Sequence, residues 1–187
     1  MARQKAYNEK EVIEKATELF WNNGYESTSM SLLEKAMGIN KFSIYASFGS
    51  KQGVFIESLK CYKNKAQDML TKLKKSPKGK EAIQEFFYDF LLFSKASNLQ
   101  KGCLLTNTSA ELGSHGNAEI MAEIASFTKE LKSIFAEKLA KDTSKSQELI
   151  SKQANFLIIA KQGLSNASKV FDRSDLEDFI ETTFENI

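Results

Sequence analysis

Residues 28–51 read TSMSLLEKAMGINKFSIYASFGSK, and this stretch predicts two short helices joined by a tight turn. Thr28 and Ser29 are residue types that cap a helix N-terminus, and Gly38 suits the left-handed conformation that ends a helix. Asn40 is a candidate cap for the second helix. The spacing of these residues therefore predicts a helix-turn-helix.

The outer face of the second predicted helix indicates what the unit can bind. Ile44 and Phe48 lie one turn apart and form the inward stripe. The side chains that fall off this stripe, and that we expect to face away from the core, are Lys41, Phe42, Ser43 and Ser47. A helix that projects a lysine, small hydroxyls and Tyr45 can enter the major groove of DNA and contact base edges. The alternative is a helical hairpin with a solvated face, since such hairpins also occur outside DNA-binding proteins.

The same stretch resembles the DNA-binding domain of the TetR (tetracycline-repressor-like) family of bacterial transcription regulators. The matching residues are Gly24, Tyr25, Thr28, the run 36–39, Ile44, Tyr45, Phe48, Ser50 and Lys51. The run YASFGSK at residues 45–51 resembles one branch of this family. Phe42 departs from the family pattern, in which a small residue is usual, and its ring suits contact with a thymine methyl group.

The resemblance implies roles for individual side chains. Lys41, Phe42 and Ser43 would face base edges. Thr28, Tyr45 and Lys51 would hold phosphates. The full set of predicted DNA-binding residues is Thr28, Asn40, Lys41, Phe42, Ser43, Tyr45, Ser47 and Lys51. A family member is also expected to bind a palindromic double-stranded operator as a homodimer.

Charge is distributed unevenly along the chain, although the net charge of its 187 residues is only +2. Residues 1–76 contain 13 Lys or Arg and 8 Asp or Glu, a net charge of +5, whereas residues 77–187 carry −3. The basic part contains the predicted helix-turn-helix, where phosphate contacts are needed. Residues 1–7 form a predicted arm in which Arg3 and Lys5 either reach DNA or remain solvated.

Other classes of protein find little support in the sequence. Two cysteines and one histidine provide neither a disulfide framework nor a zinc site, and we predict no metal and no cofactor. The longest unbroken apolar run, residues 156–160, is too short for a membrane span, and the polar N-terminus does not resemble a signal peptide. His115 lies in a Gly- and Ser-rich loop without the partners of a catalytic base. We therefore predict a cytoplasmic protein that contacts no membrane and is not an enzyme.

Helical periodicity continues through the chain and predicts an all-α fold. Besides the helix-turn-helix, the predicted helices are 8–23, 51–75, 80–96, 101–112, 118–139, 144–171 and 175–187. The long helix at 51–75 would connect two parts of the protein, and Pro77 and Gly79 mark its end. We predict a DNA-binding domain at residues 1–50 and a helical effector-binding and dimerisation domain at 51–187.

Two segments of the second predicted domain are candidates for an effector site. Five aromatic residues between positions 86 and 93 cover more than one helix face, so they form either a core or the wall of an apolar pocket. Residues 101–112 resemble the Gly-Cys-Leu segment of the same TetR branch, which implies that Cys103 senses reactive compounds with the help of Lys169. A buried inert cysteine is the alternative. The predicted effector residues are Phe86, Phe87, Phe90, Phe93, Cys103, Asn107 and Lys169.

Taken together, the residues and the resemblance predict a one-component repressor that a small-molecule or reactive effector releases from its operator. Helices 144–171 and 175–187 of two subunits would form an intersubunit four-helix bundle, as the resemblance implies. Ala160, Gly163 and Ala167 would permit close helix approach in such a bundle. The alternative function is a helical small-molecule-binding protein without a specific DNA target.

Overall fold

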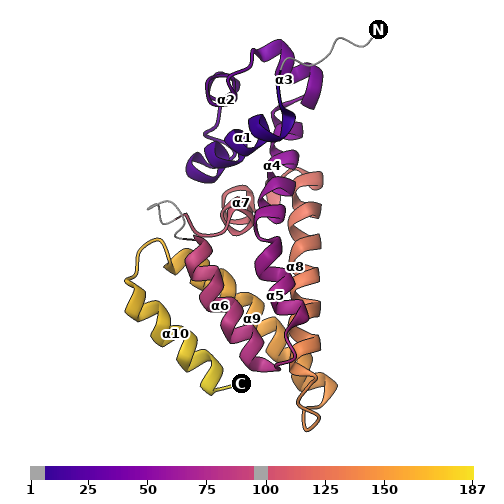
Figure 1. Cartoon of the computed structure of the whole chain (residues 1–187), viewed down its shortest axis with the longest axis vertical. Coiled ribbons are helices and arrows are strands. Elements are labelled where there is room, and N and C mark those ends of the chain that lie inside the picture. Colours follow the sequence, from indigo (N-terminus) through magenta and orange to yellow (C-terminus); the bar gives the residue numbers. More distant parts are fainter. Residues whose placement is uncertain (1–6, 95–100) are drawn as a thin grey trace. The chain divides into compact units, whose positions relative to one another are not determined.

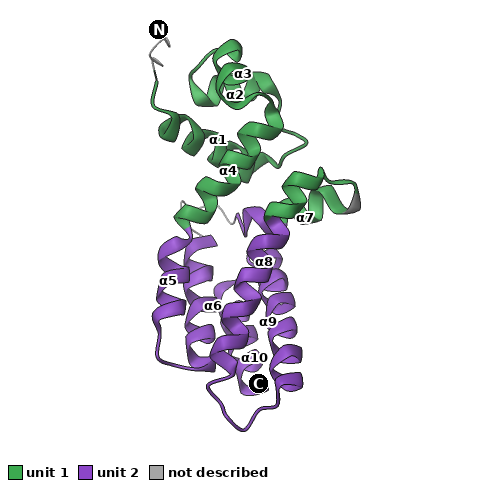
Figure 2. Cartoon of the chain, turned by 90° about the vertical axis from the view of Figure 1, so that its right-hand side faces the viewer, with its two compact units in different colours: residues 1–65, 107–123 green, residues 66–106, 124–187 purple. Residues whose placement is uncertain are grey.

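The computed structural model describes residues 7–94 and 101–187 (Figure 1). Within these two ranges the chain forms ten α-helices and one short 3-10 helix, without any strand, which confirms the predicted all-α fold. The predicted arm with Arg3 and Lys5 lies outside the described residues, except for Tyr7. The chain divides into two compact units, residues 1–65 with 107–123, and residues 66–106 with 124–187 (Figure 2).

The first unit contains the predicted helix-turn-helix. Its helices are α1 (Glu9–Asn23), α2 (Met30–Met37), α3 (Lys41–Phe48) and α4 (Lys51–Lys65). Ser29 caps α2 by accepting a hydrogen bond from the Leu32 amide, and Asn40 caps α3 by accepting one from the Ser43 amide. Gly38 adopts the left-handed conformation, with φ of 69°, and ends α2 as its sequence position predicts.

Aromatic pairs join α4 to α1 and explain why the first unit extends beyond residue 50. The rings of Phe20 and Phe55 lie 4.7 Å apart, and those of Trp21 and Tyr62 lie 5.0 Å apart, both edge to face. Such pairs add to the stabilisation that burial alone provides. The division of the chain after Lys65 therefore differs from the predicted domain boundary near residue 50.

The predicted continuous helix at 51–75 is wrong at one position. The structure instead has α4, which ends at Lys65, and α5 (Gln67–Lys75), with Ala66 between them. At Ala66 the ψ angle is −4°, far from the α-helical value near −42°, so the helix is interrupted there. The apolar spacing does not reveal this break, because Tyr62, Ala66 and Leu70 all remain buried at intervals of four residues.

The remaining helices are α6 (Lys80–Ser94), α7 (Leu104–Leu112), the 3-10 helix η1 (Gly113–His115), α8 (Ala118–Leu139), α9 (Gln147–Ala167) and α10 (Arg173–Glu185). The chain division places the end of α7, η1 and the start of α8 in the first unit. The predicted helix at 101–112 begins three residues later than expected, at Leu104. The predicted helices at 144–171 and 175–187 are present with shifted ends.

Aromatic side chains form the core of the second unit. Phe86 and Phe87 of α6 both pack against Phe135 of α8, at ring distances of 5.6 and 6.2 Å. Phe87 also packs edge to face on Phe184 of α10, at 5.2 Å. The buried ammonium group of Lys138 donates to two carbonyls at the end of α5, so this charge is compensated by the backbone.

Candidate nucleic-acid interface

Helix α3 has one buried anchor and an exposed outer face. The Ile44 side chain is fully buried, and Phe48 is half-buried. Lys41 and Tyr45 are exposed, and Phe42 is 87% exposed, which is unusual for a large apolar side chain. The Lys41 ammonium lies 5.9 Å from the centroid of the Tyr45 ring. The predicted orientation of this outer face is therefore confirmed for Lys41 and Phe42.

Polar contacts hold α3 at its N-terminus and along its second turn. The Glu34 carboxylate accepts a hydrogen bond of 3.0 Å from the Lys41 amide, and a carboxylate at this position also complements the helix dipole. The Tyr7 hydroxyl donates to the Ser43 carbonyl at 3.3 Å and lies 2.7 Å from the Ser47 hydroxyl. Ser47 therefore already has a partner within the protein. Tyr7 has no local sequence signal that connects it to a helix 36 residues away.

The structure shows an internal contact of Thr28. Its side chain is buried, and its hydroxyl donates a hydrogen bond of 2.6 Å to the Gly24 carbonyl. This bond orders the turn before α2, and Ser29 supplies the helix cap. A phosphate contact of Thr28 stays a prediction.

Lys51 at the start of α4 lies over the turn that precedes α2. Its ammonium is 4.5 Å from the centroid of the Tyr25 ring and donates to the Glu26 carbonyl at 3.3 Å. Tyr25 packs in turn on Phe55, and burial, followed by the nearby Glu26 carboxylate, raises the pKa of its phenol. The Tyr25 hydroxyl therefore stays neutral at physiological pH.

Lys41 and Lys51 each carry a positive charge that no carboxylate of the described residues neutralises. Within residues 7–94 and 101–187, neither of these ammonium groups has a carboxylate within ion-pair distance. In contrast, Lys63 pairs with Glu123 at 2.6 Å and is thereby neutralised inside the first unit. An unpaired lysine on an exposed face can neutralise a DNA phosphate without first breaking an internal ion pair.

The basic excess that we predicted for the DNA-binding part does not survive in the unit that the structure defines. Residues 1–65 contain ten basic and seven acidic side chains, and residues 107–123 add three acidic ones, so the net charge of the first unit is zero. Two positive charges are lost because residues 66–76 belong to the second unit, and the acidic segment from α7 and α8 removes the other three. Binding to DNA must therefore depend on where the charges lie, rather than on their sum.

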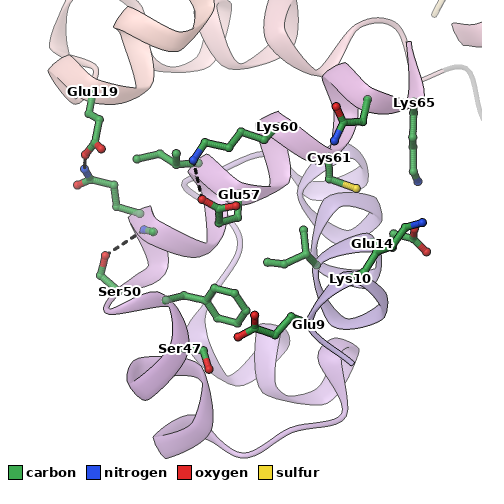
Figure 3. Close-up of a pocket in the computed structure, with 16 residues that line it drawn as sticks. Glu9, Lys10, Glu14, Ser47, Ser50, Glu57, Lys60, Cys61, Lys65 and Glu119 are labelled. Carbon is green, nitrogen blue, oxygen red and sulfur yellow. Dashed lines mark hydrogen bonds and ion pairs between the residues drawn. The ribbon is translucent and has the colours of Figure 1, made fainter. Parts of the chain in front are cut away.

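A groove of about 800 Å³ lies in the first unit beside α1 and α4 (Figure 3). Its wall carries carboxylates and ammonium groups together. The charged side chains and the cysteine labelled there are Glu9, Lys10, Glu14, Glu57, Lys60, Cys61, Lys65 and Glu119. This mixed polar wall differs from the apolar effector pocket that the sequence predicts in the second domain.

The predicted aromatic effector residues have the contacts of a packed core. Phe86, Phe87 and Phe90 are buried, and Phe93 is half-buried. Lys161 of α9, which we did not predict, is only 6% exposed and places its ammonium 4.5 Å from the centroid of the Phe90 ring. The sequence pattern that could have predicted this burial is the position of Lys161 in the apolar period of α9, four residues after Leu157 and three before Leu164.

The segment around Cys103 is anchored on α9. The Cys103 side chain is buried, and its amide donates to the Ser165 hydroxyl at 2.8 Å. Gly102 has a φ angle of 64°, and a methyl group on it would lie 2.9 Å from Cε of Lys169. The structure thus brings the predicted pair Cys103 and Lys169 into one neighbourhood. Asn107, one turn into α7, is half-buried and belongs to the first unit.

Other kinds of site find no support in the described part of the chain. Among residues 7–94 and 101–187, no helix combines the length and the apolarity that crossing a membrane requires. The same residues contain no cluster of three or more His, Cys, Asp or Glu side chains placed to hold a metal ion.

Comparisons with known proteins agree with the geometry of α2 and α3. Residues 12–57 match the family model described as bacterial regulatory proteins, tetR family. The chain is 27% identical to the uncharacterized HTH-type transcriptional regulator YezE of Bacillus subtilis (strain 168), over 98% of this chain and 97% of that protein. It is also 27% identical to IcaR of Staphylococcus aureus (strain Newman), the negative transcriptional regulator of the biofilm operon icaADBC, over 71% of this chain and 72% of IcaR.

A solved structure shows the same fold. It is a cysteine mutant of the TetR-family transcriptional regulator CifR in complex with a 26-base-pair double-strand operator DNA. Its TM-score to this chain is 0.85, with 24% sequence identity, and the alignment covers 98% of both chains.

The helix-turn-helix, with its capped and exposed second helix, defines a DNA-binding transcription regulator. Residues 12–57 of this chain match the tetR family model, and the relatives in sequence and in fold are transcription regulators rather than enzymes. The resemblance of residues 45–51 and 101–112 to one branch of that family stays a prediction.

Proposed function

We propose that this chain is a TetR-family regulator and a repressor that binds a palindromic operator as a homodimer. The observation that carries the proposal is the outer face of α3, where Lys41, Phe42 and Tyr45 are exposed on a helix that Asn40 caps and Ile44 anchors. Two relatives support it, since IcaR is a negative regulator and CifR forms a complex with operator DNA.

The proposed contacts divide into base readers and phosphate holders. Lys41, Phe42 and Ser43 at the start of α3 would contact base edges, with the Phe42 ring against a thymine methyl group. Tyr45 and Lys51 would hold phosphates, which position the protein but carry no sequence information. Asn40 and Ser47 border this surface, although their side chains also serve the α3 cap and the Tyr7 contact.

The test is a titration with duplex DNA from upstream of the protein's own gene at several salt concentrations. We expect a preference for this DNA over random duplex, and a slope of log K against log salt of about −0.9 for each phosphate neutralised. Equal affinity for both duplexes at every salt concentration would contradict the proposal. It would favour the alternative, a helical small-molecule-binding protein without a specific DNA target.

The proposed dimer uses α9 and α10. Large apolar side chains are exposed on α9, on the turn after it and on α10: Leu149, Phe156, Ile159, Val170, Phe171 and Phe179. On α9 their intervals of seven and three residues form a stripe opposite the buried face, and a methyl group on Gly163 would meet no atom within 4 Å. Exposed apolar side chains in this number favour a covering surface, and a second copy in a twofold arrangement supplies it.

A charge on this stripe tests the dimer. Ile159→Glu should give monomers in sedimentation analysis, because a carboxylate would be buried without a partner. Ser151→Glu adds the same charge to an exposed position of α9 that lies about a quarter turn around the helix axis from Ile159. We expect this variant to remain dimeric. A dimeric Ile159→Glu protein would place the interface elsewhere.

We further propose that the effector acts in the second unit at the Cys103 segment, as a small molecule or a reactive compound. The close packing of Gly102 and Cys103 on Ser165, with Lys169 alongside, supports this, because modification of the buried sulfur would disturb these contacts. The experiment compares operator release by a thiol-reactive quinone or hypochlorite in wild type, Cys103→Ser and, as the matched control, Cys61→Ser. We expect release in wild type and Cys61→Ser only. Release that persists in Cys103→Ser would instead favour a reversible ligand near Phe90, Phe93 and Lys161.

A further inference from the structure

A carboxylate from the end of α7 binds the turn between α1 and α2. One oxygen of Glu111 accepts a hydrogen bond of 2.8 Å from the Tyr25 amide, and the other accepts one of 2.8 Å from the Glu26 amide. All three residues belong to the first unit, although 85 and 86 residues separate the partners in sequence. Two consecutive amides that converge on one carboxylate form charge-assisted bonds, which are stronger than neutral ones.

Gly24 makes room for this contact. A methyl group at position 24 would lie 2.8 Å from both carboxylate oxygens of Glu111, closer than such atoms approach in proteins. Gly24 also has a φ angle of 81°, in the region that favours glycine, so the turn itself requires the residue. The absence of a side chain thus serves both the turn and the close approach of the carboxylate.

The turn that Glu111 holds supports Lys51, which we assign to DNA binding, and the start of α2. The Gly24 carbonyl accepts the Thr28 hydroxyl at 2.6 Å, and Thr28 directly precedes the cap of α2. The Glu26 carbonyl accepts the Lys51 ammonium at 3.3 Å, and the Tyr25 ring lies under the same ammonium. A displaced turn would therefore move Lys51 and the start of α2 together.

We propose that Glu111 is a positioning residue for DNA binding: its carboxylate clamps the Tyr25 and Glu26 amides, and thereby holds Lys51 in place for a phosphate contact and fixes the start of α2. This inference rests on the proposed DNA-binding function. Glu111 itself touches no DNA in this role. Removal of this negative charge should therefore lower the affinity for DNA, whereas electrostatic repulsion alone predicts that it raises the affinity.

The first experiment measures the DNA affinity of Glu111→Gln. Glu111→Gln keeps the shape of the side chain but replaces one acceptor oxygen with an NH₂ donor, which faces an amide donor. Loss of a negative charge alone should leave DNA affinity unchanged or raise it. We expect Glu111→Gln to lower affinity for operator and random duplex alike by about fivefold, the scale of a weakened charge-assisted hydrogen bond.

Glu57→Gln is the matched control, because it removes the same charge from a partly exposed site of the first unit whose carboxylate pairs only with Lys60 in the described structure. We expect its DNA affinity to equal or exceed that of wild type. If Glu111→Gln also binds as tightly as wild type, or more tightly, the inference is overturned.

A spectroscopic readout separates the clamp from a general loss of stability. In wild type the amide proton resonances of Tyr25 and Glu26 should lie downfield and exchange slowly with solvent, because both amides donate to a carboxylate. In Glu111→Gln they should move upfield and exchange faster, while the amides of buried α4 residues such as Leu59 keep their wild-type rates. Unchanged Tyr25 and Glu26 resonances would overturn the inference, even if DNA affinity had fallen.

A double-mutant cycle gives a second route. Gly24→Ala should lower DNA affinity by straining the turn and by displacing the Glu111 carboxylate. In the Glu111→Gln background the second effect is already present. The double variant should therefore lose less binding free energy than the sum of the two single losses. Fully additive losses would overturn the clamp. Failure of wild type to prefer operator DNA would instead refute the proposed function, whereas the amide resonances would still report on the contact itself.

Discussion

Helices α3 and α6 show two different ways of holding aromatic side chains. In α3 only Ile44 is fully buried, and Phe42 points its ring into solvent. In α6 the side chains of Phe86, Phe87 and Phe90 are all buried against other helices. Helix α3 is therefore kept in place by Ile44 together with caps and side-chain hydrogen bonds, which leaves its outer face free to bind, whereas α6 is kept in place by the burial of its own aromatic side chains.

The largest effect should follow from breaking the α6 core. Phe87→Ala removes a ring that packs on both Phe135 and Phe184 and leaves a cavity in the second unit. We expect the free energy of unfolding to fall by about 3–5 kcal/mol, measured by chemical denaturation. A loss below about 1 kcal/mol would show that this cluster is loosely packed, as the wall of an effector pocket would be.

On α3 the corresponding test concerns specificity rather than stability. Lys41→Ala should narrow the free-energy gap between operator and random DNA by about 1–3 kcal/mol, if the ammonium reads a guanine. Lys51→Ala should weaken binding to both duplexes by the same factor, because a phosphate contact carries no sequence information. The measurement is a pair of titrations at one salt concentration. An equal loss on both duplexes for Lys41→Ala would move Lys41 to the phosphate class.

Asn40 caps α3 and also borders the proposed DNA-binding surface. Asn40→Ala removes the acceptor of the Ser43 amide and should cost about 1 kcal/mol of unfolding free energy. Asn40→Asp keeps a capping oxygen and should retain stability, while its charge opposes DNA. Thermal unfolding and DNA titration of both variants separate the two roles of Asn40. Equal stability of Asn40→Ala and wild type would show that Ile44 alone holds the helix.

The smallest effect on stability should come from the most exposed ring. Phe42→Ala should change the free energy of unfolding by less than about 0.5 kcal/mol, because a ring that is 87% exposed contributes little to packing. Affinity for operator should still fall if the ring contacts a thymine methyl group, and replacing that thymine with uracil should remove the difference between the two proteins. A large loss of stability would contradict the surface role of Phe42.

Local signals explain why the helix-turn-helix was predictable. Ser29, Gly38 and Asn40 act within one turn of their own positions, and the stripe of Ile44 depends only on the helical period. The same reasoning found Lys41 and Phe42 on the outer face of α3, whereas the exposed stripe of Leu149, Phe156 and Ile159 on α9 appeared only in the structure. These features need no knowledge of what packs against them.

The all-α class, the helix-turn-helix and the exposure of Lys41 and Phe42 on α3 were therefore predictable from the sequence, whereas Ser43 and Ser47, predicted on the same face, are half-buried. The tertiary structure alone decided that Thr28 is buried and that Tyr7 reaches Ser47, because these depend on how turns and helices meet. It also decided that an acidic segment folds onto the first unit and that Glu111 clamps a turn 85 residues earlier in the chain. Hydrogen bonds between distant residues leave no periodic pattern in a sequence, since each partner only has to present a donor or an acceptor at the right place once the chain has folded.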